Sequence, residues 1–259
     1  MKTVFICEDS MEGIFSGIYE AWKNREREGA SGIAIGPCIE PELFCEYEET
    51  PEDHRKARAV EQMIIRNLGR EVYRAIYYAS LADDREKGNA ILGTILSARK
   101  LKDPKRIMEQ LGNVSVEKVF ELSRNVGNEA HLFTGFLRFR ELENGILFAE
   151  ISPKNQILPC LAAHFQDRFP VENWMIRDRN HTMYAVHEAG KRWILVQYEE
   201  QDTDREPDFM RFSDQEEQMQ KLWRGFCDTI AIKERLNPKC QRTNLPLRYR
   251  SDMTEFEKG

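Results

Sequence analysis

The spacing of apolar residues changes near residue 130, and this change limits the chain to folds that combine helices with a sheet. Before it, apolar side chains such as Ile14, Ile18 and Trp22 recur every three to four residues, which is typical of helices that bury one face. After it, short segments alternate apolar and polar residues, which is typical of strands. We therefore expect an α+β fold.

Residues 1–128 are expected to form a mostly helical subdomain. A short apolar strand is predicted over residues 3–7, before the first helix. The run Thr50-Pro51-Glu52-Asp53 offers an N-cap, a first-turn proline and an acid at the third helical position, which predicts a helix start. Further helices are predicted at residues 69–81, 86–100, 104–111 and 115–126.

Residues 129–200 are expected to form an antiparallel α+β subdomain. Strands are predicted at 131–142 and 146–152, and Glu143-Asn144-Gly145 between them is a hairpin signal. The order ββαβββ with tight turns predicts an antiparallel sheet covered by one helix. The other predicted elements are a helix at 157–169 and strands at 173–178, 182–187 and 192–199.

Charge is distributed unevenly along the chain. The formal net charge is −6, with 44 acidic against 38 basic residues, which argues against a chain that coats nucleic acid along its whole length. Residues 199–217 hold nine acids and two arginines, whereas residues 221–250 hold eight cations and two acids. Residues 201–259 are therefore expected to form an acidic linker, a helix opened by the capping box Ser213-Asp214-Gln215-Glu216 and an irregular basic tail packed on the rest.

The motifs of several common enzyme classes are missing from the sequence. It has no P-loop, GxGxxG, HExxH or GxSxG motif, and no three-cysteine motif for a radical-enzyme iron–sulfur cluster. Its six cysteines are scattered, so we expect no metal and no cofactor. No segment approaches the about 18 consecutive apolar residues of a membrane span, so we expect a cytoplasmic protein without a membrane partner.

The predicted strand at 131–142 carries the first candidate site. With a period of two, Phe136, Arg138 and Arg140 share one face of the strand, opposite a core face. Two guanidinium groups beside an aromatic ring suit phosphates and a stacked base. A solvated sheet face whose arginines pair with nearby acids explains the same pattern.

The predicted helix at 157–169 carries the second candidate site. His164 and Arg168 lie one turn apart along the edge of its apolar stripe, so both can contact one ligand. A histidine can donate or accept a proton near neutral pH, and His131 is a further candidate. A structural edge pair, with Arg168 extended over the core, is an equally good explanation.

The basic tail carries the third candidate site. Arg235, Arg242 and Arg248 lie among amide and aromatic residues that include Tyr249, and such a segment suits the phosphates of a nucleic acid. Alternatively, the tail folds onto the acidic residues 40–53 or 199–217 of its own chain.

A set of short motifs runs through nearly the whole chain. It includes Cys7-Glu8-Asp9-Ser10, His131-x-x-x-Gly135-Phe136-x-Arg138-Phe139, Leu161-Ala162-x-His164-Phe165-x-x-Arg168-Phe169, Trp174-x-Ile176-x-Asp178 and Pro246-x-Arg248-Tyr249. As a set these motifs resemble the DUF4130 family of bacterial DNA-metabolism proteins. The resemblance implies association with a radical-SAM protein of DNA modification or repair, and relatives are fused to a uracil-DNA glycosylase-like domain. It implies no particular catalytic residue.

Three functions remain open on the sequence. The first is an accessory protein of DNA repair or modification that binds single-stranded or damaged DNA through a confined basic surface. The second is a nucleotide- or base-acting enzyme in which His131 or His164 transfers a proton and Arg138 holds a phosphate. The third is a protein–protein adaptor for the radical-SAM protein.

Overall fold

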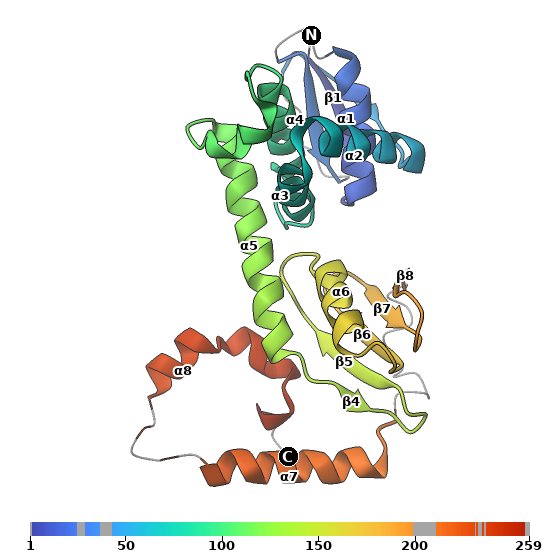
Figure 1. The fold of residues 1–259 in the computed structure, drawn as a ribbon, viewed down its shortest axis with the longest axis vertical. Coiled ribbons are helices and arrows are strands. Elements are labelled where there is room, and N and C mark those ends of the chain that lie inside the picture. Colours follow the sequence, from blue (N-terminus) through green and yellow to red (C-terminus); the bar gives the residue numbers. More distant parts are fainter. Residues whose placement is uncertain are drawn as a thin grey trace. The chain divides into compact units, whose positions relative to one another are not determined.

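The computed structural model describes residues 2–24, 29–36, 43–198, 211–230, 232, 235 and 237–256. The chain divides into two compact units, Met1–Asn128 and Glu129–Gly259, which we call unit 1 and unit 2 (Figure 1). The boundary falls within one continuous helix, α5 (Val114–Phe136). Helices and strands are mixed as predicted, so the α+β class is confirmed.

Unit 1 contains a three-stranded parallel sheet. Its order is β2 (Ser31–Ile35), β1 (Lys2–Cys7), β3 (Cys45–Glu49), and both neighbours run parallel to β1. Of these three strands only β1 was predicted, because β2 is short and contains glycine, and β3 is mostly acidic. The helices of unit 1 are α1 (Met11–Ala21), α2 (His54–Leu68), α3 (Arg70–Ser80), α4 (Lys87–Ala98) and the first part of α5, with 3₁₀ turns at Trp22–Asn24 and Pro104–Glu109.

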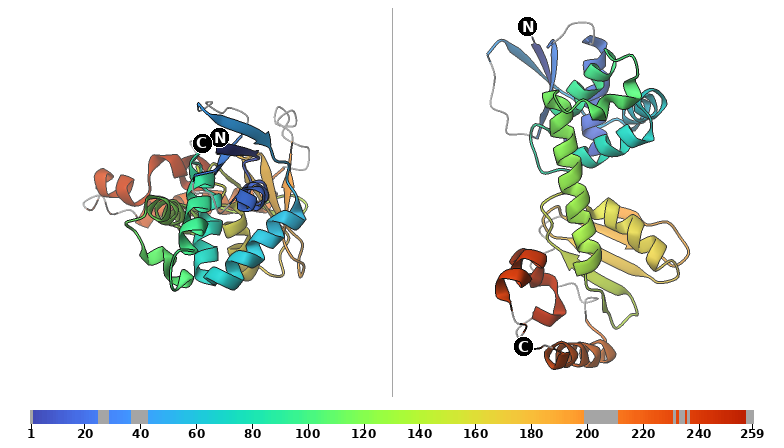
Figure 2. Two further views of the ribbon diagram at one scale, coloured as in Figure 1. Left: turned by 90° about the horizontal axis from the view of Figure 1, so that it is seen from above. Right: turned by 60° about the vertical axis from the view of Figure 1, so that its left-hand side comes forward.

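Close packing holds α1 and α4 on the same face of this sheet (Figure 2). Ile33 of β2 meets both Gly17 of α1 and Gly88 of α4. A Cβ atom built at Gly17 would lie 2.2 Å from the Cys7 sulfur, and one at Gly88 would lie 2.5 Å from Ile33. Glycine at these positions therefore lets the helices approach the strands closely.

Helix α2 begins later than predicted. Asp53 is its N-cap, because the Asp53 carboxylate accepts hydrogen bonds from the backbone N–H groups of Arg55 and Lys56. Thr50 and Pro51 precede the helix in extended chain rather than opening it. The N–H bonds lower the pKa of the Asp53 carboxyl, since they favour its ionised form.

Unit 2 contains a five-stranded mixed sheet. The strands lie in the order β4 (Arg140–Glu141), β5 (Leu147–Ile151), β6 (Trp174–Asp178), β7 (Met183–His187) and β8 (Ile194–Gln197). The predicted ββαβββ element order is correct, but the expected antiparallel pairing is wrong at one place, because β5 and β6 are parallel. Helix α6 (Leu158–Arg168) lies between these two strands in the chain and serves as the crossover that parallel strands require.

The predicted strand at 131–142 is wrong for most of its length. Residues 131–136 are the last turns of α5, and only Arg140–Glu141 forms a strand. The buried side chains Val126, Ala130, Phe133 and Leu137 recur at helical spacing, so burial along a helix outweighs the period-two pattern. Phe136, Arg138 and Arg140 therefore do not share one strand face.

The C-terminal part of unit 2 is more regular than predicted. Its elements are α7 (Asp214–Ile230), α8 (Pro238–Asn244) and 3₁₀ turns at Leu247–Asp252 and Thr254–Phe256. Ser213 is the N-cap as predicted, since its hydroxyl accepts a bond from the Glu216 N–H at 3.1 Å. The return bond of the predicted capping box is replaced by bonds to Glu141: the Ser213 N–H donates to the Glu141 carbonyl at 3.0 Å, and the Glu216 carboxylate accepts from the Glu141 N–H at 3.1 Å. Pro238 begins α8 rather than ending regular structure, with Asn237 as its N-cap.

Residues 199–210 of the expected acidic linker lie outside the described residues. Within the parts of the chain that are described, no helix is both long and apolar enough to cross a bilayer.

Candidate functional site

All ten candidate residues lie in unit 2 or in the part of α5 that belongs to it. The structure sorts them by exposure. Phe136, Arg138 and Arg140 are half-buried, and Tyr249 is buried with 3% of its surface exposed. The exposed candidates are His131, His164, Arg168, Arg235, Arg242 and Arg248.

Arg138 is held by a carboxylate from the end of the chain. Its guanidinium donates from Nη2 to Glu255 Oε1 at 2.8 Å and from Nε to Glu255 Oε2 at 3.3 Å. The indole Nε1–H of Trp223 also donates to Glu255, at 3.4 Å. Burial acts to raise the pKa of Glu255, but the bonds and charge of Arg138, a backbone N–H and the Trp223 indole together outweigh it and hold that pKa below its usual value. Arg138 is thus already paired with an anion.

A second ion pair fastens the same segment. Arg179, which follows β6, is paired with Asp252. We call the two pairs Arg138–Glu255 and Arg179–Asp252 the acidic clasp. The tail is therefore held on unit 2 by its own acids, which lie just beyond the basic residues 221–250.

Tyr249 anchors the tail through its ring. The ring packs edge-on against Phe133, with centroids 5.0 Å apart, and lies 5.2 Å from Phe136. Arg248 donates a hydrogen bond to the Tyr249 hydroxyl at 2.6 Å. Because Tyr249 and Phe136 are packed on each other, Tyr249 acts here as a core residue and not as an open stacking surface.

Arg140 belongs to a network on the sheet. Its guanidinium lies 4.3 Å from the centre of the Phe212 ring and 3.7 Å from the Glu150 carboxylate. Glu150 also pairs with Arg177 at 3.3 Å, and Arg177 donates to the Tyr198 hydroxyl at 3.2 Å. Arg140 and Arg138 thus have different acidic partners, as expected for arginines that stabilise the fold.

The cations around α8 differ from these arginines. Arg235, Lys239 and Arg242 are exposed, and none of the three has an ion pair with any residue that the structure describes. Helix α8 has no buried residue, and residues 235–251 contain no acid. We call residues 235–250 the basic segment. It presents positive charge that the described part of the fold does not neutralise.

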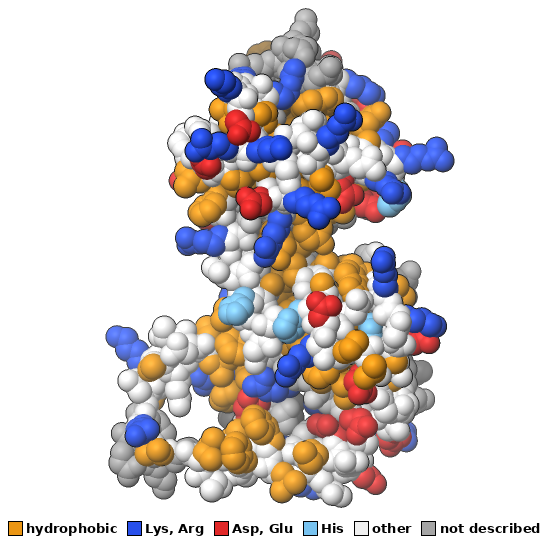
Figure 3. Space-filling model, viewed as in Figure 1, with side chains coloured by type: hydrophobic (Ala, Val, Ile, Leu, Met, Phe, Trp, Pro, Cys, Tyr) orange, Lys and Arg blue, Asp and Glu red, His pale blue; other side chains and the backbone are white. Residues whose placement is uncertain are grey.

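The candidate histidines lie on two helices of unit 2. His131 is on α5, and His164 is on α6 with Arg168 one turn later. Phe139 links the end of α5 to α6, because its ring packs edge-on against Phe165 at 5.0 Å. Histidine side chains are visible over α5 and α6 on the face drawn in Figure 3.

Neither of these histidines has a carboxylate hydrogen-bond partner among the described residues. A catalytic base is usually oriented by such a third group. The arrangement therefore suits surface contacts better than a preorganised proton transfer.

Sequence reasoning missed a polar cluster in unit 1. It lies where β1 and β3 end, because the carboxyl ends of parallel strands meet at one edge of a sheet. Lys87, with 1% of its side chain exposed, pairs with Asp9 and donates to the Ala82 carbonyl at 2.7 Å. The Ser10 hydroxyl bonds to Glu52 in the same region. The motif Cys7-Glu8-Asp9-Ser10 was noticeable in the sequence, but the parallel sheet that gives it this position was not predicted.

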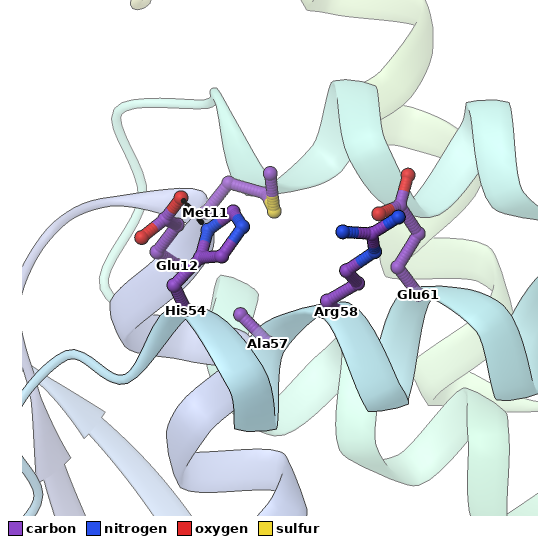
Figure 4. Close-up of a pocket in the computed structure, with 6 residues that line it drawn as sticks. All are labelled: Met11, Glu12, His54, Ala57, Arg58 and Glu61. Atoms are coloured by element: carbon purple, nitrogen blue, oxygen red, sulfur yellow. Dashed lines mark hydrogen bonds and ion pairs between the residues drawn. The ribbon is translucent and has the colours of Figure 1, made fainter.

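Beside this cluster lies a shallow groove of about 290 Å³. His54 Nδ1 and Glu12 Oε1 are 3.1 Å apart at one end, near Met11, and Arg58 and Glu61 stand at the other end (Figure 4). His54 and Arg58 are exposed, so the groove is open to solvent and does not enclose a ligand.

Comparison with known proteins places most of the chain in one family. The family model described as "Domain of unknown function (DUF4130)" matches residues 85–255. A search of curated proteins finds no significant match. The matched region contains all ten candidate residues and leaves out the groove of unit 1. Because this match covers well over half of the sequence, the chain belongs to the DUF4130 family.

Proposed function

We propose that the protein binds nucleic acid through the basic segment of unit 2. The observation that carries this proposal is the exposure of Arg235, Lys239 and Arg242 without a carboxylate partner among the described residues. By contrast, Arg138 and Arg179 are each paired with an acid. Unpaired exposed cations near one another are the usual contacts to a phosphate backbone.

The surroundings of these cations favour a confined contact. Lys239 and Arg242 are three residues apart on α8, so both project from neighbouring positions of one short helix. The chain as a whole has a formal net charge of −6, so the rest of its surface repels a polyanion. Contacts of this kind position a nucleic acid and carry no sequence information directly. We therefore expect binding with little sequence preference.

The family resemblance extends the proposal to DNA metabolism. On that resemblance alone, the protein is an accessory factor of DNA repair or modification that acts beside a radical-SAM protein, and its ligand is single-stranded or damaged DNA. Of the two remaining functions, the enzyme is less favoured, since His131 and His164 lack an orienting carboxylate in the described structure. Phe136, Arg138 and Tyr249 are now assigned to holding the tail.

A binding experiment with a matched control tests the proposal. Fluorescence anisotropy would measure the affinity of the chain for a labelled single strand of about 20 nucleotides and for a duplex. The triple variant Arg235→Ala/Lys239→Ala/Arg242→Ala should lose at least tenfold in affinity. Its log–log salt slope should be shallower by about 2, since each lost phosphate contact on a single strand removes about 0.7.

The matched control is Lys102→Ala/Lys105→Ala/Arg124→Ala, which removes three exposed cations of unit 1. It changes the net charge equally, so it should lose much less affinity than the first variant. Equal affinity of the basic-segment variant and the wild type for both ligands would contradict the proposal.

A further inference from the structure

Strand β8 forms one edge of the sheet in unit 2, and β4 forms the other (Figure 1). The β4 edge is covered by the chain itself, because the Glu143 N–H donates to the Arg211 carbonyl at 2.8 Å and the Ser213 N–H to the Glu141 carbonyl at 3.0 Å. Among the described residues, β8 pairs with β7 and with no strand on its other side. One edge of the described sheet is therefore covered and the other is open.

The open edge is apolar and lacks the usual protections of an edge strand. All four residues of β8 are exposed, with 58% of the surface of Ile194, 37% of Leu195 and 41% of Val196 open to solvent. The strand contains no charged residue and no proline, and its ladder with β7 has no bulge. Because charges, prolines and bulges are the usual means of preventing edge-to-edge pairing, β8 is a template for another strand.

The ladder with β7 determines which backbone groups of β8 face outward. The Tyr198 N–H donates to the Thr182 carbonyl, just before β7, at 3.0 Å. Residues of an antiparallel strand alternate in direction, so Val196 also directs its N–H and C=O groups at β7. Leu195 and Gln197 therefore direct theirs away from the sheet.

We propose that β8 pairs in antiparallel orientation with β8 of a second copy of this chain, so that the two sheets join across a two-fold axis. The Trp193 N–H already donates to the Gln166 side chain at 3.1 Å, which leaves Leu195 and Gln197 to form the new ladder. Both are used when Leu195 of one copy lies opposite Gln197 of the other, and these two pairs exchange about four backbone hydrogen bonds. The axis then passes beside Val196, which lies opposite Val196 of the second copy.

The charges next to the strand favour the same strand of a second copy as the partner. Arg192, just before β8, is exposed and has no ion pair with any residue that the structure describes, whereas Lys191 is paired with Glu188. In the sequence, Glu199 and Glu200 follow the strand closely and lie outside the described residues. An antiparallel copy brings each Arg192 toward the glutamates of the other chain, whereas a parallel copy brings Arg192 toward Arg192. The strand is thus complementary to itself in the antiparallel direction.

The contact is small, so the dimer should be weak. Two strands of this length bury less surface than the about 1,200 Å² at the lower end of standard interfaces. We expect a Kd on the order of 100 µM.

Sedimentation equilibrium of the full chain from about 5 µM to about 500 µM tests the pairing. The wild type should pass from monomer toward dimer over this range. Val196→Lys and Val196→Glu should each stay monomeric, because each places two like charges opposite one another at the axis. An equimolar mixture of the two variants should dimerise again, since the opposed charges are then complementary.

Val114→Lys and Val114→Glu are the matched controls, because Val114 is 80% exposed and lies in unit 1, at the start of α5. Both should dimerise like the wild type, and circular dichroism would establish that every variant is folded. The proposal is overturned if the wild type stays monomeric at about 500 µM, or if Val196→Lys dimerises equally well. A mixture of the two Val196 variants that stays monomeric would overturn the antiparallel register centred on Val196.

Discussion

At the scale of single residues, the partner of each arginine decides its role. Arg138 and Arg140 were predicted to share a sheet face for phosphates, and the structure gives each an acidic partner instead. Glu255 lies 117 residues from Arg138 in the chain, so no local pattern could have predicted this pair. The local pattern made Arg235 and Arg242 candidates for phosphate contacts, but it left open whether the tail folds onto acidic residues of its own chain; the structure shows both side chains exposed.

Removing Arg138, one of the two arginines of the acidic clasp, should lower the stability of the fold. Arg138→Ala leaves the Glu255 carboxylate half-enclosed without its main donor, so we expect a loss of about 1 kcal/mol in the free energy of unfolding. Urea denaturation would measure it. Arg168→Ala is the control, because Arg168 is exposed and has no ion pair in the described structure, and its effect should stay within about 0.5 kcal/mol. Equal effects of both changes would contradict the role given to the clasp.

Lowering the pH should break the Arg138–Glu255 pair of the acidic clasp. Arg138 lowers the pKa of Glu255 in the folded chain, so the stability from this pair is complete above the ordinary glutamate pKa of about 4.3 and is lost as the pH falls through the lowered value. Asp252 has the opposite sign, because burial raises its pKa and disfavours its ionised form. The protection of the amides of residues 247–256, expressed relative to the intrinsic exchange rate at each pH, should therefore fall below about pH 4.

The comparison for this titration is Glu255→Gln, which keeps the size of the side chain but cannot ionise. It should exchange faster at neutral pH and show a weaker acid transition. A wild type and a variant with the same pH profile would show that Glu255 does not hold the tail.

At the scale of elements, local signals located helices better than strands. Ser213 was predicted as an N-cap because its bond from the Glu216 N–H lies within four residues. The parallel pairing of β5 with β6 was not, since strand direction depends on how α6 packs back on the sheet. The end of α5 was mistaken for a strand because His131 to Arg140 also alternates, and only the burial of Phe133 and Leu137 decides between the two periods.

Gly135 distinguishes these two interpretations. In a strand over residues 131–142 it would stand in the strand interior, whereas in the structure it lies in α5 with open space where a Cβ would stand. Gly135→Ala should therefore stabilise the protein by about 0.5 kcal/mol, since glycine is a poor helix former. Thermal unfolding would measure the change. A clear loss of stability would contradict the helical assignment.

At the scale of the whole molecule, the fold separates cations that stabilise it from cations that remain open to a ligand. Counting charge along residues 221–250 gave the location of the positive excess, but it could not tell paired from unpaired cations. Asp252 and Glu255, the acids that follow the counted segment, pair with Arg179 and Arg138 of unit 2 and not with cations of the segment itself. The cations that remain exposed without an acidic partner in the described structure are those of the basic segment around α8, and they suit a polyanion.

The most direct test of the central claim is amide hydrogen exchange of the full chain with and without single-stranded DNA. The nucleic acid should protect residues 237–250, where Lys239 and Arg242 stand exposed on α8, and leave the groove beside His54 unchanged. Protection should fade between about 50 mM and 200 mM salt, as phosphate contacts do. No change in the basic segment at saturating DNA, or protection confined to unit 1, would contradict the account.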